Sequence, residues 1–366
     1  MRRQWSALTA LALASLVAAT AGCSTDDAGG AGASEATLTS TSEGATTSLA
    51  AVTSTSTTPT TEAVASRSGR IVFVSSRDQK APSVFVMNAD GTDVVRLSTG
   101  AAGFGDSDPA WSPDGSAIAY DSATADQQVL MIVAPDGSGA RQLTEAGDGS
   151  ASDPAWSPDG SRILYHVNVD GRNEVWTIAP DGSDPRRLAD DGLDPAWSPD
   201  GTRVAFLSFR DGRSAIFSVA ADGTGLVRVT ETHGAFEWSP DGTMIAFTCV
   251  GESSQDICSV NADGSGLTRL AASADMESDP HWAPDGRRIA YRRSGASPAL
   301  VVMNSDGTGE RELPSCLLEQ WPPDGTWMVV VIDDHIHTMN ADGSGLVQLT
   351  DNELGDSSPR LTPSKP

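Results

Sequence analysis

The chain has 366 residues and a formal net charge of −25, because 49 acidic residues outnumber 24 basic ones. Such a charge is repelled by the phosphate backbone of nucleic acids and by anionic lipid head groups. Nucleic acid is therefore excluded as an expected partner. After the first 22 residues, no segment is apolar enough to cross a membrane.

The first residues have the layout of a secretory signal peptide. Arg2 and Arg3 precede an apolar run over residues 8–19, and small residues follow it. The run is too short to span a hydrocarbon core of about 30 Å. We therefore expect residues 1–22 to be a signal peptide that is removed on export.

Cys23 ends a short motif that resembles a bacterial lipobox, Thr20-Ala21-Gly22-Cys23, although the family pattern prefers Leu where Thr20 stands. The resemblance implies that Cys23 is acylated and becomes the mature N-terminus. The protein would then be exported and anchored by lipid to the cell membrane, on its periplasmic or extracellular face. The alternative is an ordinary signal peptide followed by an incidental cysteine.

Residues 23–68 consist almost wholly of Ser, Thr, Ala, Gly and a few acids, without an aromatic residue. A stretch of this composition cannot bury enough apolar surface to offset its conformational entropy. We predict a disordered, Ser/Thr-rich tether between the lipid anchor and the folded domain.

A five-residue theme that opens with tryptophan and ends in Pro-Asp-Gly recurs through the rest of the chain. It starts at Trp111, Trp156, Trp197, Trp238, Trp282 and Trp321, with spacings of 39 to 45 residues. A second theme ending in Asp-Gly alternates with the first and occurs seven times. A degenerate seventh copy of the first theme lies at residues 356–363 and matches residues 106–113. This period is typical of propeller blades of four strands each.

Each repeat predicts four strands joined by tight turns. In the second full repeat we expect strands over residues 154–157, 162–167, 174–179 and 186–189. Apolar residues alternate along the second of these strands, as a strand requires. The Pro-Asp-Gly and Asp-Gly sequences supply the residues that tight turns favour.

The repeat register also predicts how the ring closes. The folded region begins near Arg70 with a second strand, and it ends over residues 358–363 with a first strand. One blade would therefore combine strands from both ends of the domain, which protects the sheet edges. We predict an all-β, seven-bladed β-propeller over residues 69–363, followed by a tail at 364–366.

These repeats resemble the TolB-type propeller repeat, in which a D-P-x-W-S-P-D-G core precedes an I-A-F-like strand. The resemblance covers residues 70–363 and implies a propeller fold. Two differences stand out. TolB proper has an N-terminal α/β domain that this chain lacks, and its propeller has six blades where we count seven repeats.

Three cysteines remain after Cys23. Cys249 and Cys258 fall on two strands of a predicted hairpin, where they form either a cross-strand disulfide or two packed thiols. Cys316 is left over. Without clustered histidines or a CxxC motif, a zinc site is not expected.

One position, three residues before the tryptophan, carries an aspartate in four repeats: Asp108, Asp153, Asp194 and Asp279. These carboxylates could gather at the mouth of the central channel and hold a hard cation such as calcium. Alternatively, each aspartate caps its own loop by accepting backbone N–H bonds, and this second interpretation is the one we favour. His281, which lies near Asp279 and Glu237 in the predicted fold, is a further candidate ligand.

We therefore predict a non-catalytic binding or scaffolding lipoprotein of the cell envelope. It would act as a monomer and recognise an envelope protein or a cationic ligand through its acidic variable loops, with no required cofactor. The alternative is a metal-dependent enzyme with a site at the channel mouth, because related propellers occur as polysaccharide lyases. A peptidase is disfavoured because no G-x-S-x-G nucleophile motif follows.

Overall fold

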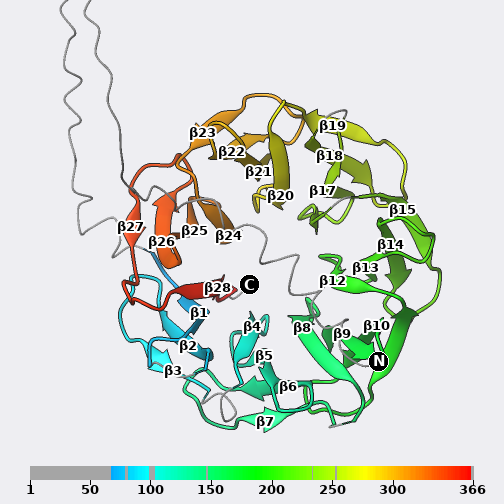
Figure 1. The fold of residues 1–366 in the computed structure, drawn as a ribbon, viewed down its shortest axis with the longest axis vertical. Coiled ribbons are helices and arrows are strands. Elements are labelled where there is room, and N and C mark those ends of the chain that lie inside the picture. The colour runs from blue at the N-terminus through cyan, green and yellow to red at the C-terminus, as the bar shows by residue number, and fades with distance from the viewer. Residues whose placement is uncertain are drawn as a thin grey trace, which may run out of the picture. The chain divides into compact units, whose positions relative to one another are not determined.

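The computed structural model describes residues 67–78, 81–98, 104–145, 147–232, 234–251 and 254–363. These residues form seven antiparallel, four-stranded sheets around a central channel (Figure 1). We number the sheets as blades 1 to 7 in chain order. The predicted all-β, seven-bladed propeller is confirmed, and the described residues contain no helix that could cross a membrane.

Each blade runs from an innermost strand at the channel to an outermost strand at the rim. In this order, blade 1 contains β28 (Asp356–Leu361), β1 (Arg70–Ser75), β2 (Ser83–Asn88) and β3 (Val95–Arg96). Blade 2 contains β4 (Asp106–Trp111), β5 (Ile118–Ala123), β6 (Gln128–Val133) and β7 (Arg141–Gln142). Blade 3 contains β8 (Ser150–Trp156), β9 (Ile163–Val169), β10 (Arg172–Ile178) and β11 (Arg186–Asp190).

The remaining blades repeat this order. Blade 4 contains β12 (Leu193–Trp197), β13 (Arg203–Ser208), β14 (Ala215–Ala220) and β15 (Val227–Glu231). Blade 5 contains β16 (Phe236–Trp238), β17 (Met244–Val250), β18 (Gln255–Asn261) and β19 (Thr268–Ala271). Blade 6 contains β20 (Met276–Trp282), β21 (Arg288–Ser294), β22 (Ala299–Asn304) and β23 (Arg311–Leu313), and blade 7 contains β24 (Leu317–Gln320), β25 (Trp327–Ile332), β26 (His335–Asn340) and β27 (Val347–Gln348).

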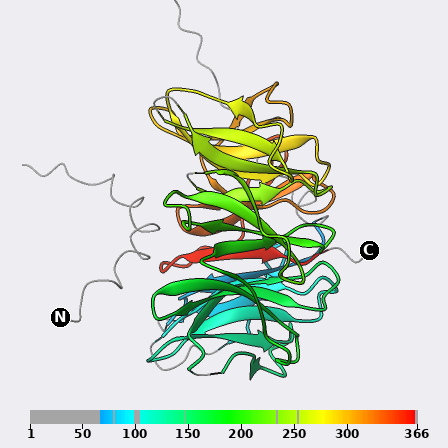
Figure 2. The same cartoon turned by 90° about the vertical axis from the view of Figure 1, so that its right-hand side faces the viewer.

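Blade 1 closes the ring with strands from the two ends of the domain. β28 pairs with β1 in antiparallel register, with Ile71 opposite Leu361 and Ser75 opposite Asp356. Figures 1 and 2 both show β28 in red beside β1 in blue. The predicted closure is therefore confirmed. Leu361 is 3% exposed and packs in an apolar cluster with Ile71 and Phe73.

The innermost strands are tied to one another by the repeated tryptophans. In four places an indole N–H donates to a main-chain carbonyl of the preceding blade: Trp111 to Arg360 at 3.0 Å, Trp156 to Ala110 at 3.2 Å, Trp197 to Ala155 at 3.3 Å and Trp238 to Ala196 at 3.4 Å. The indole nitrogens of Trp282 and Trp321 are buried without a partner. The tryptophans therefore belong to the framework of the ring.

The folded part begins slightly before its predicted boundary. Arg67, which we expected in the tether, is buried. Its guanidinium lies 5.4 Å from the ring centroid of Trp327 and donates to Asn340 and Gly345. The predicted signal peptide, the predicted acylation site Cys23, the tether up to residue 66 and the predicted tail at 364–366 lie outside the described residues.

The structure joins Cys249 and Cys258 by a disulfide across the β17–β18 hairpin, with a Cα–Cα distance of 5.8 Å. Cys316 is a buried free thiol. Burial raises the pKa of Cys316 to about 12, so this thiol is neutral at physiological pH.

Replacing Leu361 by alanine should destabilise the ring at its closing blade. The change removes a buried side chain and leaves a cavity, so the free energy of unfolding should fall by about 2–5 kcal/mol. Denaturant unfolding followed by tryptophan fluorescence measures this difference. Leu354→Ala is the matched control because Leu354 lies in the same C-terminal segment and is 53% exposed. Equal stability of the two variants would contradict the assigned closure.

Candidate functional site in the central channel

The residue that precedes each repeated tryptophan lies on the channel wall. In blades 2, 3 and 4 it is alanine, whereas in blades 5, 6 and 7 it is Glu237, His281 and Gln320. In blade 1, where Leu361 replaces the tryptophan, the corresponding residue is Arg360. Where the indole bond forms, the carbonyl of this residue carries the structural contact. Its side chain is therefore free to differ from blade to blade. At this position, blades 2 to 4 present alanine to the channel, and blades 5, 6, 7 and 1 present polar or charged side chains.

The repeated aspartate three residues before the tryptophan lies at a β-bulge. Asp108, Asp153, Asp194 and Asp279 have φ between 47° and 55°, and in each blade the pairing register shifts at this point. Aspartate is among the few residue types that tolerate this left-handed conformation. The bulge turns each carboxylate out of the regular alternation of its strand.

The favoured interpretation that these aspartates cap their own loops was wrong. In the described residues, none of the four side chains accepts a hydrogen bond from a backbone N–H. That role belongs instead to the aspartate of the Pro-Asp-Gly turns. Asp114, for example, accepts from the backbone N–H of Ser116 at 2.9 Å, and the hydroxyls of Ser112 and Ser116 help to lower its pKa to about 2.

Blades 2 to 4 contribute a group of carboxylates that we call the acidic wall: Asp108, Asp121, Asp153 and Asp194, with His166 among them. The imidazole of His166 lies 3.0 Å from the carboxylate of Asp153 and 3.0 Å from the hydroxyl of Ser152. Asp121 is fully buried and accepts hydrogen bonds from Ser107 and Gln128 through one carboxylate oxygen. Its other oxygen has no partner.

Burial, and after it the crowding of like charges, raises the pKa values of three carboxylates in the acidic wall. Burial, and then the charge of Asp108, raise the pKa of Asp121 to about 7. Burial and the charge of Asp153 raise the pKa of Asp108. Asp194 is exposed to the channel, but enclosure by the walls and the charge of Asp153 raise its pKa as well.

His166 is the counter-charge within the acidic wall. Burial lowers its pKa, but the hydrogen bond and the charge of Asp153, together with the charges of Asp194 and Asp121, outweigh burial and raise it. The acidic wall therefore carries more negative than positive charge and would attract a cation.

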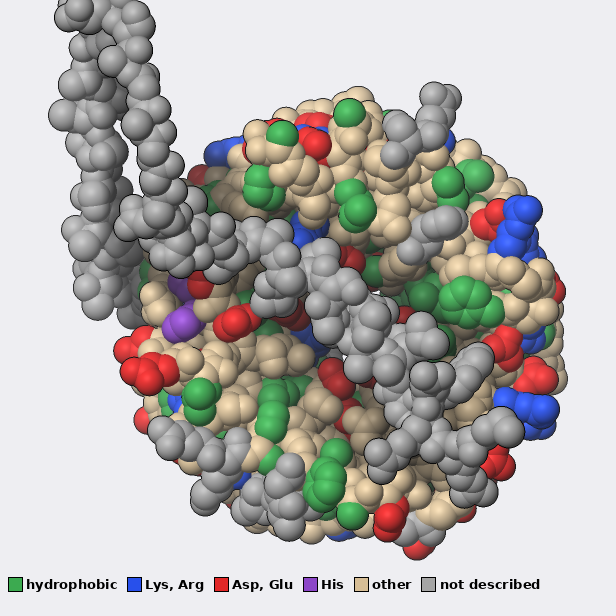
Figure 3. Space-filling model, viewed as in Figure 1, with side chains coloured by type: hydrophobic (Ala, Val, Ile, Leu, Met, Phe, Trp, Pro, Cys, Tyr) green, Lys and Arg blue, Asp and Glu red, His purple; other side chains and the backbone are tan. Residues whose placement is uncertain are grey.

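Blades 5, 6, 7 and 1 contribute what we call the mixed wall: Glu237, Asp279, His281, Arg292, Glu319, Gln320 and Arg360. His281 lies 3.1 Å from the carboxylate of Glu237, and Arg360 donates to Glu319 at 2.8 Å. The wall lines a cavity of about 690 Å³. On the face shown in Figure 3, acidic and basic side chains both lie near the central opening.

The mixed wall also links the innermost strands where the indole bonds fail. The carboxylate of Glu237 accepts the backbone N–H of Trp282 at 3.2 Å, and the amide oxygen of Gln320 accepts that of Leu361 at 2.6 Å. Burial lowers the pKa of His281, but the hydrogen bond and the charge of Glu237, with the charges of Asp279 and Glu319, raise it overall. His281 is therefore favoured as an imidazolium paired with a carboxylate.

The six residues predicted as ligand-binding fall in two places. Asp108 and Asp153 line a cavity of about 470 Å³ in the acidic wall, where Asp194 adds its charge. Glu237, Asp279 and His281 line the larger cavity on the other side of the channel. The structure therefore presents two neighbouring sites of different charge.

Sequence reasoning missed Asp121, His166 and Arg292, which occupy one repeated position on the second strand of their blades. Gln320 and Arg360 were also missed. Comparing the residue before each tryptophan, and before Leu361 in the seventh copy, would have found both, since that residue is alanine in three other repeats.

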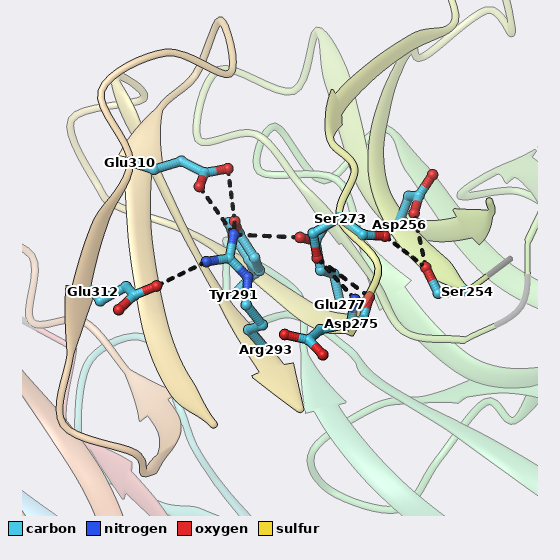
Figure 4. A network of polar contacts seen from close by, with 9 residues as sticks. All are labelled: Ser254, Asp256, Ser273, Asp275, Glu277, Tyr291, Arg293, Glu310 and Glu312. Atoms are coloured by element: carbon cyan, nitrogen blue, oxygen red, sulfur yellow. Dashed lines mark hydrogen bonds and ion pairs between the residues drawn. The ribbon is translucent and has the colours of Figure 1, made fainter. Parts of the chain in front are cut away.

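A polar cluster outside the channel has a structural role (Figure 4). Glu277 is fully buried at the start of β20, and its carboxylate lies 3.4 Å from the guanidinium of Arg293. Arg293 also pairs with Glu310 at 2.9 Å and donates to the hydroxyl of Tyr291 at 2.7 Å. Burial raises the pKa of Glu277 more than Arg293 lowers it. These contacts fasten the innermost strand of blade 6 to its outer strands.

Among the described residues, no group of three histidine, cysteine, aspartate or glutamate side chains is arranged to hold a metal ion. The acidic wall nevertheless concentrates hard oxygen ligands of the kind that calcium prefers. A metal therefore stays a hypothesis for this wall.

A family model described as the TolB beta propeller domain matches residues 61–320. No curated protein matches the chain. Among solved structures, TolB from Acinetobacter baumannii is 18% identical, with 81% of this chain and 67% of that chain covered and a TM-score of 0.53. An oligogalacturonate lyase in complex with manganese is 14% identical, with 77% and 85% covered and a TM-score of 0.58.

A structure from a mechanistic study of two prolyl endopeptidases is also similar, with 14% identity and a TM-score of 0.61. The match covers 77% of this chain but only 48% of that chain. At these identities the similarities to solved structures show the propeller fold alone.

Replacing Asp121 by asparagine should flatten the dependence of stability on pH. The unfolded chain loses the Asp121 proton near the ordinary pKa of 3.8, whereas the folded chain keeps it until about pH 7. The stability contributed by this proton is therefore complete at low pH and is lost as the pH rises through about 7. Asparagine carries no such proton, so between pH 5 and pH 8 the variant should lose less stability than the wild type.

The free energy of unfolding measured at four pH values over this range checks the expectation. His166 has a raised pKa and contributes in the same direction, so some slope should remain in the variant. Asp126→Asn, in an exposed loop, should keep the wild-type slope. The assigned burial of Asp121 is wrong if Asp121→Asn keeps that slope as well.

Proposed function

Because the chain belongs to the TolB β-propeller domain family, we propose that it is a binding module of the cell envelope that recognises a cationic segment of a partner protein. The observation that carries this proposal is the acidic wall, where three blades contribute four carboxylates and the charges of Asp121, Asp153 and Asp194 act on one histidine. Burial, and then the repulsion of neighbouring aspartates, raise the pKa values of Asp108, Asp121 and Asp194, and a positively charged side chain that enters the channel would relieve that repulsion.

The sequence supports the location that we propose for this module. The signal-like residues 1–22 and the lipobox-like motif at Cys23 favour export and acylation, and residues 23–66 would hold the propeller clear of the membrane surface. The protein would therefore meet its partner at the periplasmic or extracellular face of the membrane, as a lipid-anchored monomer.

Removing two charges from the acidic wall should weaken partner capture. In a pull-down from envelope extract with the full chain as bait, Asp153→Asn/Asp194→Asn should recover less partner than the wild type. The same variant should bind a tri-arginine peptide about tenfold more weakly at low salt, with a smaller loss at high salt.

The matched control is Asp126→Asn/Asp170→Asn, which removes the same charge from exposed loop tips. Asp170 has a φ of 50°, a conformation that asparagine also tolerates. Thermal melting shows whether each variant is folded. Equal loss of binding in both variants would mean that only the net charge of the protein matters, not the acidic wall. An extract that yields no partner above background would count against a binding module.

A metal-dependent enzyme is the second candidate, favoured by the carboxylates of the acidic wall and by the placement of His281 and Gln320 on one cavity. Because the described residues present no triad of metal ligands, we expect calcium or manganese to leave the melting temperature of the full chain unchanged. A metal-induced rise that disappears in Asp194→Ala or Asp279→Ala would instead favour the metal site, and elemental analysis would then give its stoichiometry.

A further inference from the structure

Arg292 is a cation without a partner in the wall of the larger cavity. It lies on β21, opposite Ser278 of β20 and Leu300 of β22, and it is half-buried. Every other buried or half-buried arginine in the described ranges has an ion pair or a hydrogen bond through its guanidinium. Arg292 has neither, and it lines the cavity of about 690 Å³.

The absence of a partner is unexpected in a chain with 49 acidic and 24 basic residues. The carboxylates of Glu237 and Glu319 on this cavity are already paired with His281 and Arg360. The third carboxylate on the cavity, Asp279, accepts from the hydroxyl of Ser278 and forms no ion pair with Arg292. A guanidinium that is partly withdrawn from water without an anion is less stable than a paired one, so its retention in a cavity wall favours a ligand that brings the anion. Arginine donates to a carboxylate through two parallel N–H groups, which makes a carboxylate the fitting counter-ion.

The surface beside Arg292 is apolar. Leu318 stands at the position that carries an aspartate in four other blades, and Leu317 is 44% exposed at the cavity. Leu300 and Phe236 complete this lining. Blades 6 and 7 therefore place aliphatic side chains next to a free guanidinium.

We propose that this cavity binds a ligand with a carboxylate beside an aliphatic group, held by Arg292 and by the leucines of blades 6 and 7. Two sources share this chemistry: the free C-terminus of a peptide that ends in an aliphatic residue, and a short-chain aliphatic acid. The volume lies in the range of small-ligand pockets. The cavity shares Gln320 and Arg360 with the cavity beside the acidic wall, but Arg292 and the leucines line only the larger one, so the proposal does not rest on the capture of a cationic partner.

Isothermal titration of the full chain with three probes tests the proposal: N-acetyl-leucyl-leucine, its C-terminal amide, and hexanoate. The free acid should bind, and the amide should bind about tenfold more weakly because it cannot form the charged pair. Binding of the peptide acid alone assigns the site to peptide C-termini. Binding of hexanoate alone assigns it to aliphatic acids, and binding of both supports the shared chemistry.

Arg292→Gln should weaken the probe that binds by about tenfold or more, and thermal melting shows whether this variant is folded. Arg172→Gln is the matched control, because Arg172 is exposed at the start of β10 and also has no partner. Leu318→Asp restores the residue type of four other blades and should abolish binding by pairing with Arg292.

Three results would overturn the proposal: no heat of binding from any probe, equal binding of the acid and the amide, or unchanged affinity in Arg292→Gln. None of them affects the capture of the tri-arginine peptide, which depends on the acidic wall. Failure at this cavity is therefore distinguishable from failure of the proposed function.

Discussion

The bond between a tryptophan indole and a main-chain carbonyl of the neighbouring blade is the constraint on which the channel depends. Four such bonds tie the innermost strands of blades 1 to 5 into one curved wall. Because a carbonyl belongs to every residue, this contact sets no requirement on the side chain that faces the channel. The repeat can therefore keep its framework while the residue before the tryptophan changes from alanine to a charged or polar type.

Where the indole bonds are missing, side chains take over part of their role. Glu237 and Gln320 each accept a backbone N–H from the next innermost strand. These two residues therefore contribute to both the ring and the cavity. The same half of the ring contains Arg292, His281 and Arg360, so the half with the fewest framework bonds is also the half with the most varied chemistry. The two walls meet at Arg360, whose charge lowers the pKa of Asp108 against the stronger effect of burial.

The fold could be predicted from the sequence because each repeat contains its own turns, its alternating strands and its tryptophan. Even the closing strand was recognisable from the degenerate copy at residues 356–363. The side chains that line the channel were harder to predict from the sequence. Asp121, His166 and Arg292 share one position, but hydrophobic residues fill it in three other blades, so no recurring residue type marks it. The aspartates before the tryptophans were recognised as a set. Their left-handed backbone, however, follows from a register shift between paired strands. The residue pattern of a single strand does not reveal such a shift.

The shared blade also fixes the order in which this chain can reach its native state. β1 is synthesised before every other strand, but its neighbour on the channel side, β28, lies about 280 residues later in the chain. Until translation has passed residue 361, the growing chain has an unprotected sheet edge at its first blade. Completion of the ring therefore coincides with the end of synthesis of the domain, because its last strand is also one of the last segments of the domain to be made.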